Sequence, residues 1–198
     1  MENKYNTKEF NEVIQNRRSV YPYQFESGKK IRDEIIFQIL ENANRAPTHK
    51  LTQPWRFTVF SGKGLETFAD LQTEIYTKYA GSNFKEKKLK NLKEYPLMSS
   101  HVIAIGMKRT TEINIPEEEE IIATACAIEN IYLSVTAYGL GGYLSTGGIT
   151  YLEEAKPYFG LERKDKLIGF FYIGYPKILS NPLSKRTSVN EKTKWIAE

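Results

Sequence analysis

The segment 121–138 constrains the fold most, because it is apolar around almost the whole circumference of a helix. Its apolar and small residues are Ala123, Ala125, Cys126, Ala127, Ile128, Ile131, Tyr132, Leu133, Val135 and Ala137. A helix with so little polar face is buried on all sides. A chain of 198 residues fits one compact domain. The pattern therefore predicts a core helix that also forms a subunit interface.

A run of glutamates at positions 117–120 precedes this helix. Negative charge is favourable at a helix N-terminus, and Asn114 is a candidate for the N-cap. Consecutive residues on one turn face different directions, so the run does not predict a metal site. We expect a solvated helix start whose charges match the helix dipole.

Helical and β-prone segments occur throughout the rest of the chain. Apolar residues at helical spacing predict helices over 30–46, 63–80 and 152–159. β-branched and aromatic residues predict strands over 56–60, 101–107 and 166–176. The lysine-rich segment 83–94 has few apolar residues, which favours a solvated mobile segment; a lid over a substrate site is the alternative.

Composition excludes several classes of protein. Cys126 is the only cysteine in the sequence, which excludes an intramolecular disulfide and a cysteine-based metal cluster, so we expect no metal. The formal net charge of +4 favours anionic ligands such as phosphates but does not indicate nucleic acid. No apolar run reaches the roughly 20 residues of a membrane helix. The N-terminus is not a signal peptide, so we expect a cytoplasmic protein.

Thr7 can cap a helix with Phe10, Val13 and Ile14 on one face, and candidate phosphate donors follow this helix at Arg17, Arg18 and Ser19. Adjacent guanidinium groups and a hydroxyl suit a phosphate, although a solvated basic pair at a helix C-terminus is the alternative. A glycine-rich segment at 141–148 permits close backbone approach and positive φ. It matches neither a Walker loop nor the GxGxxG pattern.

The loop 45–57, RAPTHKLTQPWRF, lies where a predicted helix ends and a strand begins. Pro47 ends the helix, and Pro54 stiffens the turn. The side chains of His49, Gln53 and Trp55 suit a flat polar ligand. An ordinary helix-to-strand loop with a buried tryptophan is the alternative reading of the residues alone.

This loop resembles the A-P-S-x-x-N-x-Q-P-W segment of the nitroreductase family, the FMN-dependent NAD(P)H oxidoreductases. Leu51 stands at the Asn position of that pattern, and the form with His49 resembles a compact bacterial subgroup. The segments 16–20, 141–147 and 166–176 are also similar to the family and occur in its order. The resemblance covers nearly the whole chain, as a single domain over 1–198.

The resemblance implies an α+β fold, with a central, mainly antiparallel sheet flanked by helices. It implies a homodimer in which a C-terminal extension, about 177–198, packs on the partner subunit. It also implies bound FMN, with flavin contacts from Arg17, Arg18, Ser19, Arg45, His49, Leu144, Ser145, Thr146 and Arg186. The first three residues and Arg186 are expected at the phosphate. Tyr21 stands where many members have a basic residue near the flavin ring.

The function that the resemblance implies is the reduction of nitro compounds, quinones or similar small organic acceptors by NAD(P)H. Hydride transfer would follow a ping-pong scheme, and no catalytic protein side chain is expected because FMN carries the chemistry. A non-catalytic FMN-binding or storage protein is one alternative, and a specialised FMN-dependent reductase such as a dehalogenase is another. The sequence leaves open the acceptor and the choice between NADH and NADPH.

Overall fold

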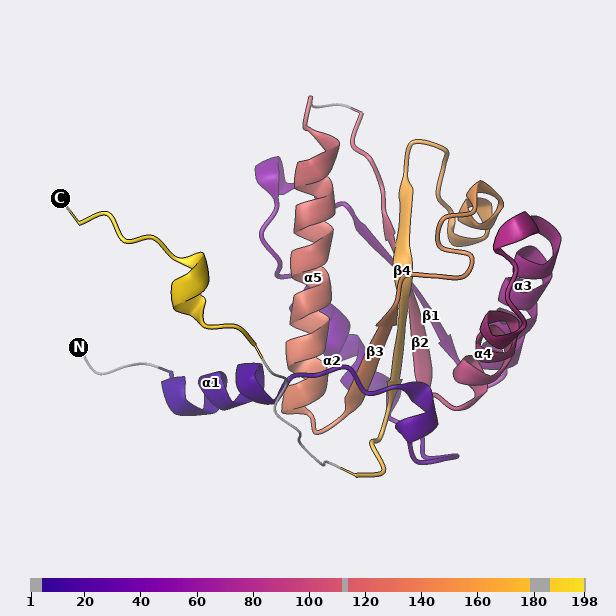
Figure 1. Cartoon of the computed structure of the whole chain (residues 1–198), viewed down its shortest axis with the longest axis horizontal. Coiled ribbons are helices and arrows are strands. Elements are labelled where there is room, and N and C mark those ends of the chain that lie inside the picture. Colours follow the sequence, from indigo (N-terminus) through magenta and orange to yellow (C-terminus); the bar gives the residue numbers. More distant parts are fainter. Residues whose placement is uncertain (1–4, 112–113, 179–185, 198) are drawn as a thin grey trace.

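The computed structural model describes residues 5–111, 114–178 and 186–197. Within these ranges the strands are β1 (Trp55–Ser61), β2 (His101–Met107), β3 (Gly141–Ser145) and β4 (Lys166–Gly174). They form one sheet in the order β1-β2-β4-β3, with every neighbouring pair antiparallel (Figure 1). The strands predicted at 56–60, 101–107 and 166–176 are confirmed within one or two residues at their ends.

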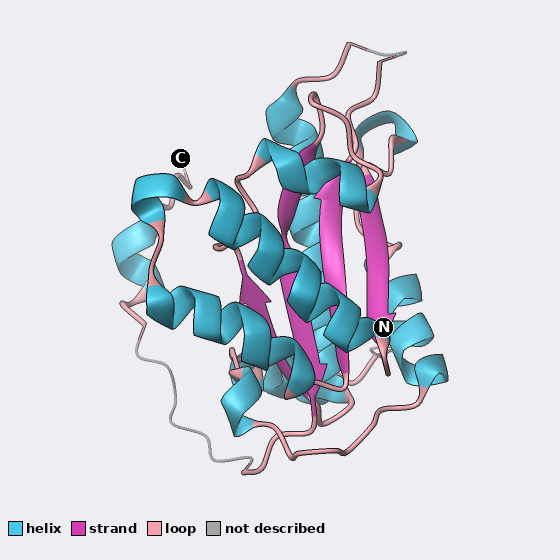
Figure 2. Cartoon of the chain, turned by 90° about the vertical axis from the view of Figure 1, so that its right-hand side faces the viewer, coloured by secondary structure: helices cyan, strands magenta, loops and turns pink. Residues whose placement is uncertain are grey.

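Helices cover both faces of the sheet. One face carries α2 (Asp33–Ala43) and α5 (Glu117–Ala137), and the other carries α3 (Gly64–Tyr79) and α4 (Glu86–Leu97), which Figure 2 shows in front of the strands. Strand residues alternate between two cores: Ile103 packs with α2 and α5, and Val102 packs with α3 and α4. This alternation follows from the pleat of a strand. The predicted α+β architecture is confirmed.

Shorter elements complete the described chain. Helix α1 (Thr7–Asn16) extends away from the sheet on the side of α5, as does the described part of the C-terminal segment (Figure 1). The 3₁₀ turns are Pro22–Gln24, His49–Leu51, Gly81–Asn83, Glu153–Phe159 and Val189–Lys192. The helix predicted at 152–159 is therefore a 3₁₀ segment.

The lysine-rich segment is an ordered helix, α4, and the prediction of a solvated mobile segment is wrong. Leu92 and Pro96 are buried against the neighbouring elements, and the Gln72 side chain on α3 donates a hydrogen bond to the Leu92 carbonyl. Its lysines lie mostly on the outer side. The sequence misled because the few apolar residues, spaced four apart, are enough to attach a short helix to a larger neighbour.

Helix α5 is the longest helix in the described chain, and only part of its surface is buried. Ala127, Ile131 and Val135 face the sheet, whereas Ile122 is 61% exposed and Ala125 is also exposed. The sequence predicts that this helix is buried on all sides. A single chain does not provide that burial. By length and composition α5 could cross a membrane, but 44% of its most apolar stretch is buried inside the fold, as in a core helix of a globular protein.

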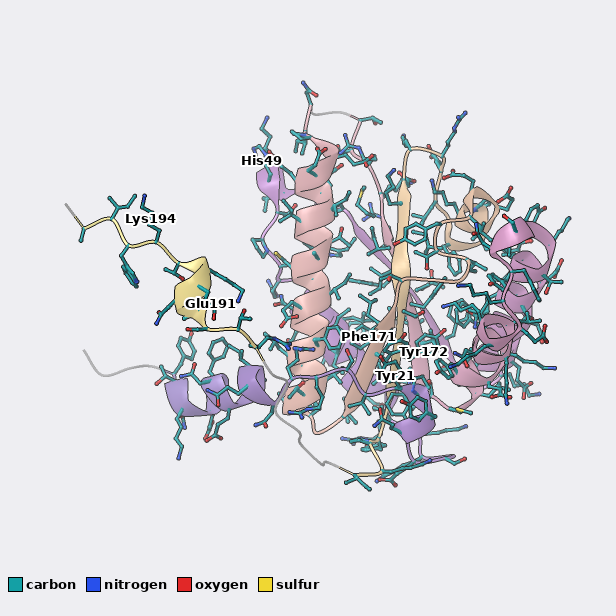
Figure 3. All side chains as sticks on the ribbon, in the orientation of Figure 1. Tyr21, His49, Phe171, Tyr172, Glu191 and Lys194 are labelled. Carbon is teal, nitrogen blue, oxygen red and sulfur yellow. The ribbon has the colours of Figure 1, made fainter. Side chains whose placement is uncertain are left out.

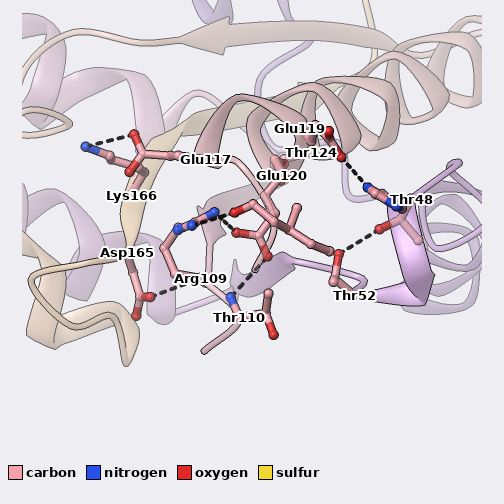
Figure 4. A network of polar contacts seen from close by, with 12 residues as sticks. Thr48, Thr52, Arg109, Thr110, Glu117, Glu119, Glu120, Thr124, Asp165 and Lys166 are labelled. Carbon is pink, nitrogen blue, oxygen red and sulfur yellow. Dashed lines mark hydrogen bonds and ion pairs between the residues drawn. The ribbon is translucent and has the colours of Figure 1, made fainter. Parts of the chain in front are cut away.

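The glutamate run does not form a uniformly solvated helix start, and this prediction is wrong for Glu120. Its carboxylate is 1% exposed, forms an ion pair with Arg109 and accepts a hydrogen bond from Thr110 N at 3.0 Å (Figure 4). Asp165 accepts from Arg109 N at 2.9 Å. The N-cap is Pro116 rather than Asn114. A buried charge requires such partners, and these contacts anchor the start of α5 to two loops.

Candidate functional site

The arginine-rich segment after α1 runs along the free edge of β3. Ser19 forms a parallel bridge with Gly142, and Val20 N donates a hydrogen bond to Gly142 O at 2.8 Å. Edge strands have unpaired backbone groups, so a passing segment attaches there. The pairing fixes Ser19 at the beginning of β3.

Tyr132, on α5, brings several of the predicted residues together. Its hydroxyl accepts a hydrogen bond from Leu144 N at 2.9 Å and lies 3.4 Å from Ser19 Oγ. The Arg17 guanidinium stands over the same ring, 5.1 Å from its centroid. Arg17, Ser19 and Leu144 therefore lie together around one side chain. The sequence pattern predicts only a core position for Tyr132, although the hydroxyl of a buried tyrosine usually takes a polar partner.

Arg17 retains hydrogen-bonding capacity for an anion. The carboxylate that it faces among the described residues is that of Glu129, with Nε 4.0 Å from Oε1, and the Glu129 side chain is 54% exposed. An ion pair with this separation and an exposed carboxylate contributes little free energy. Arg18 Nε donates to Asn16 O at 2.9 Å. Guanidinium groups beside the Ser19 hydroxyl are a donor set that fits a phosphate.

At the other end of β3 the predicted contact residues differ in exposure. Leu144 is half-buried, Ser145 is buried and Thr146 is exposed. Gly147 and Gly148 follow, and a Cβ atom at Gly147 would lie 2.9 Å from Lys88 Nζ. These glycines allow side chains of α4 to approach the turn closely, which explains part of the glycine-rich pattern.

Lys88, on α4, is the titratable group of this region that sequence reasoning missed. It is half-buried, and burial lowers the pKa of its ammonium group. No described residue forms an ion pair or hydrogen bond with its Nζ. The available signal was its position four residues before the buried Leu92, which places both on the same helix face.

The loop that carries Arg45 and His49 has an unusual backbone. Lys50, Leu51 and Gln53 have φ values of 48°, 55° and 45°, a region that L-residues other than Asn and Asp seldom adopt. Thr48 Oγ1 holds the loop by accepting a hydrogen bond from Gln53 N at 3.2 Å. Clusters of such conformations are typical of functional sites.

His49 lies far from Ser19 along α5, whereas Arg45 lies nearer the middle of this helix, because its N donates to Asn42 O, which also accepts from Asn130 Nδ2 at 3.0 Å. Both Arg45 and His49 are exposed, and the His49 ring contacts Glu119 in the first turn of α5. At about 1.5 Å per residue, Glu119 and Tyr132 are about 20 Å apart along this helix. Figure 3 shows His49 in the upper part of the view and Tyr21, two residues after Ser19, in the lower part. A single chain therefore does not bring all the predicted residues into one site.

The remaining predicted ligand, Arg186, is exposed at the start of the described C-terminal segment. Part of the predicted extension, 179–185 and 198, lies outside the described residues. Within the described ranges, no group of three or more His, Cys, Asp or Glu side chains could hold a metal ion.

Comparison with known proteins identifies the family. The model of the nitroreductase family matches residues 14–175. The Escherichia coli K12 protein named "Putative NAD(P)H nitroreductase YdjA" is 30% identical over 157 residues, which cover 79% of this chain and 81% of the relative. The chain belongs to the nitroreductase family, and the resemblance of its motifs is confirmed.

Solved structures have the same fold. A nitroreductase-like family protein from Bacillus cereus superimposes with a TM-score of 0.79 at 26% identity, over 100% of both chains. The FMN- and NADPH-dependent nitroreductase NfnB from Sphigopyxis sp. strain HMH has a TM-score of 0.72 at 14% identity, covering 95% of this chain and 99% of its own.

Proposed function

We propose that this protein is an FMN-dependent oxidoreductase that uses NAD(P)H to reduce nitro compounds, quinones or similar small organic acceptors. The observation that carries the proposal is the cluster of Arg17, Ser19 and Leu144 around Tyr132, in a chain of the nitroreductase family. The Escherichia coli relative is named for NAD(P)H, and the Sphigopyxis structure for FMN and NADPH.

The chain's own residues would bind and orient the cofactor. Arg17, Arg18 and Ser19 are assigned to the phosphate, because they offer charged donors and a hydroxyl at one end of β3. Leu144, Ser145 and Thr146 would line the flavin along that strand. FMN, when bound, supplies the chemistry by taking a hydride from NAD(P)H and passing two electrons to the acceptor.

A homodimer would supply the missing end of the site. A two-fold axis that crosses the exposed face of α5 pairs two copies of this helix antiparallel. The start of one helix, with Glu119 and His49, then lies beside Tyr132 of the other. In this arrangement the partner subunit's Arg45 and the partner subunit's His49 would meet the phosphate donors of the first chain, and Arg186 of the extension would add a further donor. The exposed Ile122 and Ala125 support an interface on this face.

The test of the proposed function is spectroscopic. Purified protein should show a flavin absorbance spectrum, the released flavin should be FMN, and NADH or NADPH should bleach it under anaerobic conditions. Bound FMN that neither nucleotide reduces would favour the storage alternative. Colourless protein that does not take up FMN would overturn the proposal.

Kinetics test the proposed ping-pong scheme, in which nicotinamide and acceptor stack on the same face of the flavin. If nicotinamide and acceptor occupy the same place in turn, double-reciprocal plots at several acceptor concentrations are parallel. Intersecting lines would require both ligands to be bound together. A halogenated acceptor that is turned over much faster than nitro compounds or quinones would favour the dehalogenase alternative.

We also propose a cytoplasmic location, which fractionation of the source cells would test.

A further inference from the structure

An unpaired ammonium group lies at the end of β3. Lys88 is half-buried between α4 and the turn at Gly147, and none of the described residues neutralises it. An ammonium group without a partner costs free energy when it is partly removed from water. Burial alone lowers its pKa, since no neighbouring charge contributes. Such a position is suited to a charge that a ligand brings.

The approach of Lys88 depends on glycine. A Cβ at Gly147 would lie 2.9 Å from Lys88 Nζ, and one at Gly148 would lie 3.3 Å from Lys88 Cε. The side chain therefore lies directly against the backbone of this turn, next to Ser145 and Thr146. Its neighbours on α4, Lys87 and Lys90, are exposed. Within the lysine-rich helix, Lys88 is thus distinguished from these two by its orientation.

The segment after Ser19 places aromatic rings against β3, on the same face of the sheet as α4. Tyr21 packs against Tyr143, with ring centroids 4.5 Å apart, and Tyr23 stacks on Tyr21 at 5.5 Å. Burial raises the pKa of the Tyr143 hydroxyl, which keeps this group neutral. The segment after Ser19 therefore presents no cation at Tyr21 or Tyr23, and Lys88 approaches the strand from a different element.

We propose that Lys88 is the residue of this chain that stabilises the negative charge of reduced FMN. This inference rests on the proposed function. Transfer of a hydride, two electrons with one proton, converts NAD(P)H to NAD(P)⁺ and gives the flavin one additional negative charge. An ammonium group within a few ångströms in a partly desolvated site favours that charged form over the oxidised one.

The two cationic regions would then bind different parts of one elongated ligand. Ser19 pairs at Gly142, near the start of β3, and Lys88 lies at Gly147, two residues past the end of this strand. Arg17 at the first end is assigned to the phosphate, whose charge does not change on reduction. Lys88 is assigned to the end whose charge changes.

The test measures the midpoint potential of the FMN-loaded protein against reference dyes, for wild type, Lys88→Met, Lys88→Arg and Lys87→Met. Loss of the charge should weaken reduced FMN relative to oxidised FMN about tenfold, which lowers the potential by about 30 mV for two electrons. Lys88→Arg should stay near wild type, and so should Lys87→Met, the matched exposed lysine one residue away. Melting temperatures confirm that each variant is folded.

A second measurement does not depend on turnover. FMN should protect Lys88 from acetylation, read by mass spectrometry, and should leave Lys87 reactive. An unchanged potential in Lys88→Met, or an equal shift in Lys87→Met, would overturn this assignment while the protein still held FMN. Failure of the wild type to bind FMN would overturn the proposed function together with it.

Discussion

Tyr132 shows how one side chain can organise a site. Its ring lies under the Arg17 guanidinium, and its hydroxyl links Ser19 to the backbone of Leu144. These contacts join the end of α1 to α5 and β3, and 113 residues separate Ser19 from Tyr132 in the sequence. At the residue scale the candidate site is therefore a junction of three elements, and single substitutions should separate its functions.

Arg17→Ala should weaken FMN binding at least tenfold. A charged hydrogen bond contributes on the order of 1.5–3 kcal/mol, and the phosphate is the group that it contacts in our proposal. Riboflavin, which lacks the phosphate, should bind to the wild type and to the variant almost equally. Fluorescence titration of both ligands measures this, and an equal loss for riboflavin would remove Arg17 from the phosphate site.

Lys88→Met should raise the stability of the FMN-free protein at neutral pH. Burial lowers the pKa of Lys88 in the folded chain. The charged ammonium group therefore carries a free-energy penalty in the folded state that it does not carry in the unfolded state. This penalty is fully present below the lowered pKa and fades as pH rises toward the unfolded lysine value of about 10.4. The difference in melting temperature between variant and wild type should shrink over the same window.

The control for that experiment is again Lys87→Met, which should show little difference at any pH because its ammonium is exposed. A stability gain from Lys88→Met that did not change up to high pH would point to better apolar packing rather than to the removal of a charge.

At the element scale, the 48–53 loop keeps several residues in the left-handed region. Lys50 is exposed and has φ 48° and ψ 28°, a conformation that costs a side-chain-bearing residue about 1–2 kcal/mol. Lys50→Gly should therefore stabilise the protein by about 1 kcal/mol, or about 2–4 °C in melting temperature. Lys90→Gly, in the interior of α4, should destabilise it by about 1 kcal/mol. A loss in both variants would contradict the argument from φ.

Helix α5 should show the proposed two-fold contact directly. Ala125 and Cys126 lie midway between Glu119 and Tyr132, so an antiparallel pair that joins these ends brings the two copies of Cys126 close together. Packed helices lie about 8–10 Å apart. A short bismaleimide should therefore link wild-type chains into a covalent dimer on a denaturing gel.

The cross-link has a matched control on another helix. Cys126→Ser should abolish it, and a cysteine at the exposed Lys90 of α4, in the Cys126→Ser background, should not restore it at the same protein concentration. Efficient linkage through α4 instead would place the interface on the other face of the sheet.

At the scale of the whole molecule, two arms leave the body with their apolar side chains exposed. Phe10 on α1 is 59% exposed, and Trp195 in the C-terminal segment is 86% exposed. Ile14 on α1 and Ile196 next to Trp195 are exposed as well, and several exposed apolar side chains on one segment indicate an interaction surface. In our proposal both arms pack on the second copy of the chain.

Association and FMN binding should therefore be linked. If the dimer completes the site, FMN at 100 times its dissociation constant stabilises the folded dimer by about 2.7 kcal/mol and shifts a dilution series toward dimer. Light scattering with and without FMN measures this, and truncation before Arg186 should weaken both dimer and flavin affinity. A monomer that binds FMN at full affinity would contradict a shared site.

The sequence alone predicted the main elements, and it indicated Arg17, Arg18 and Ser19 as candidate phosphate donors. Local patterns were sufficient for strands such as β2. Its residues are buried on both faces of the sheet, and its short apolar run by itself predicts a buried strand. The family motifs also placed Arg17, Ser19 and Leu144 in one site, and the structure brings them together around Tyr132. The order of the motifs, their spacing and the chemistry of their residues can be taken from the sequence directly, because none of them depends on contacts between distant segments.

Only the tertiary structure decided what depends on packing between distant segments. Glu120 is buried because Arg109 and Thr110 meet it there, although its neighbours in the glutamate run are solvated. Lys88 differs from Lys87 because α4 turns one side toward Gly147 and the other toward water. The sequence of a charged run is nearly uniform, and the surface against which it packs determines which charge is enclosed.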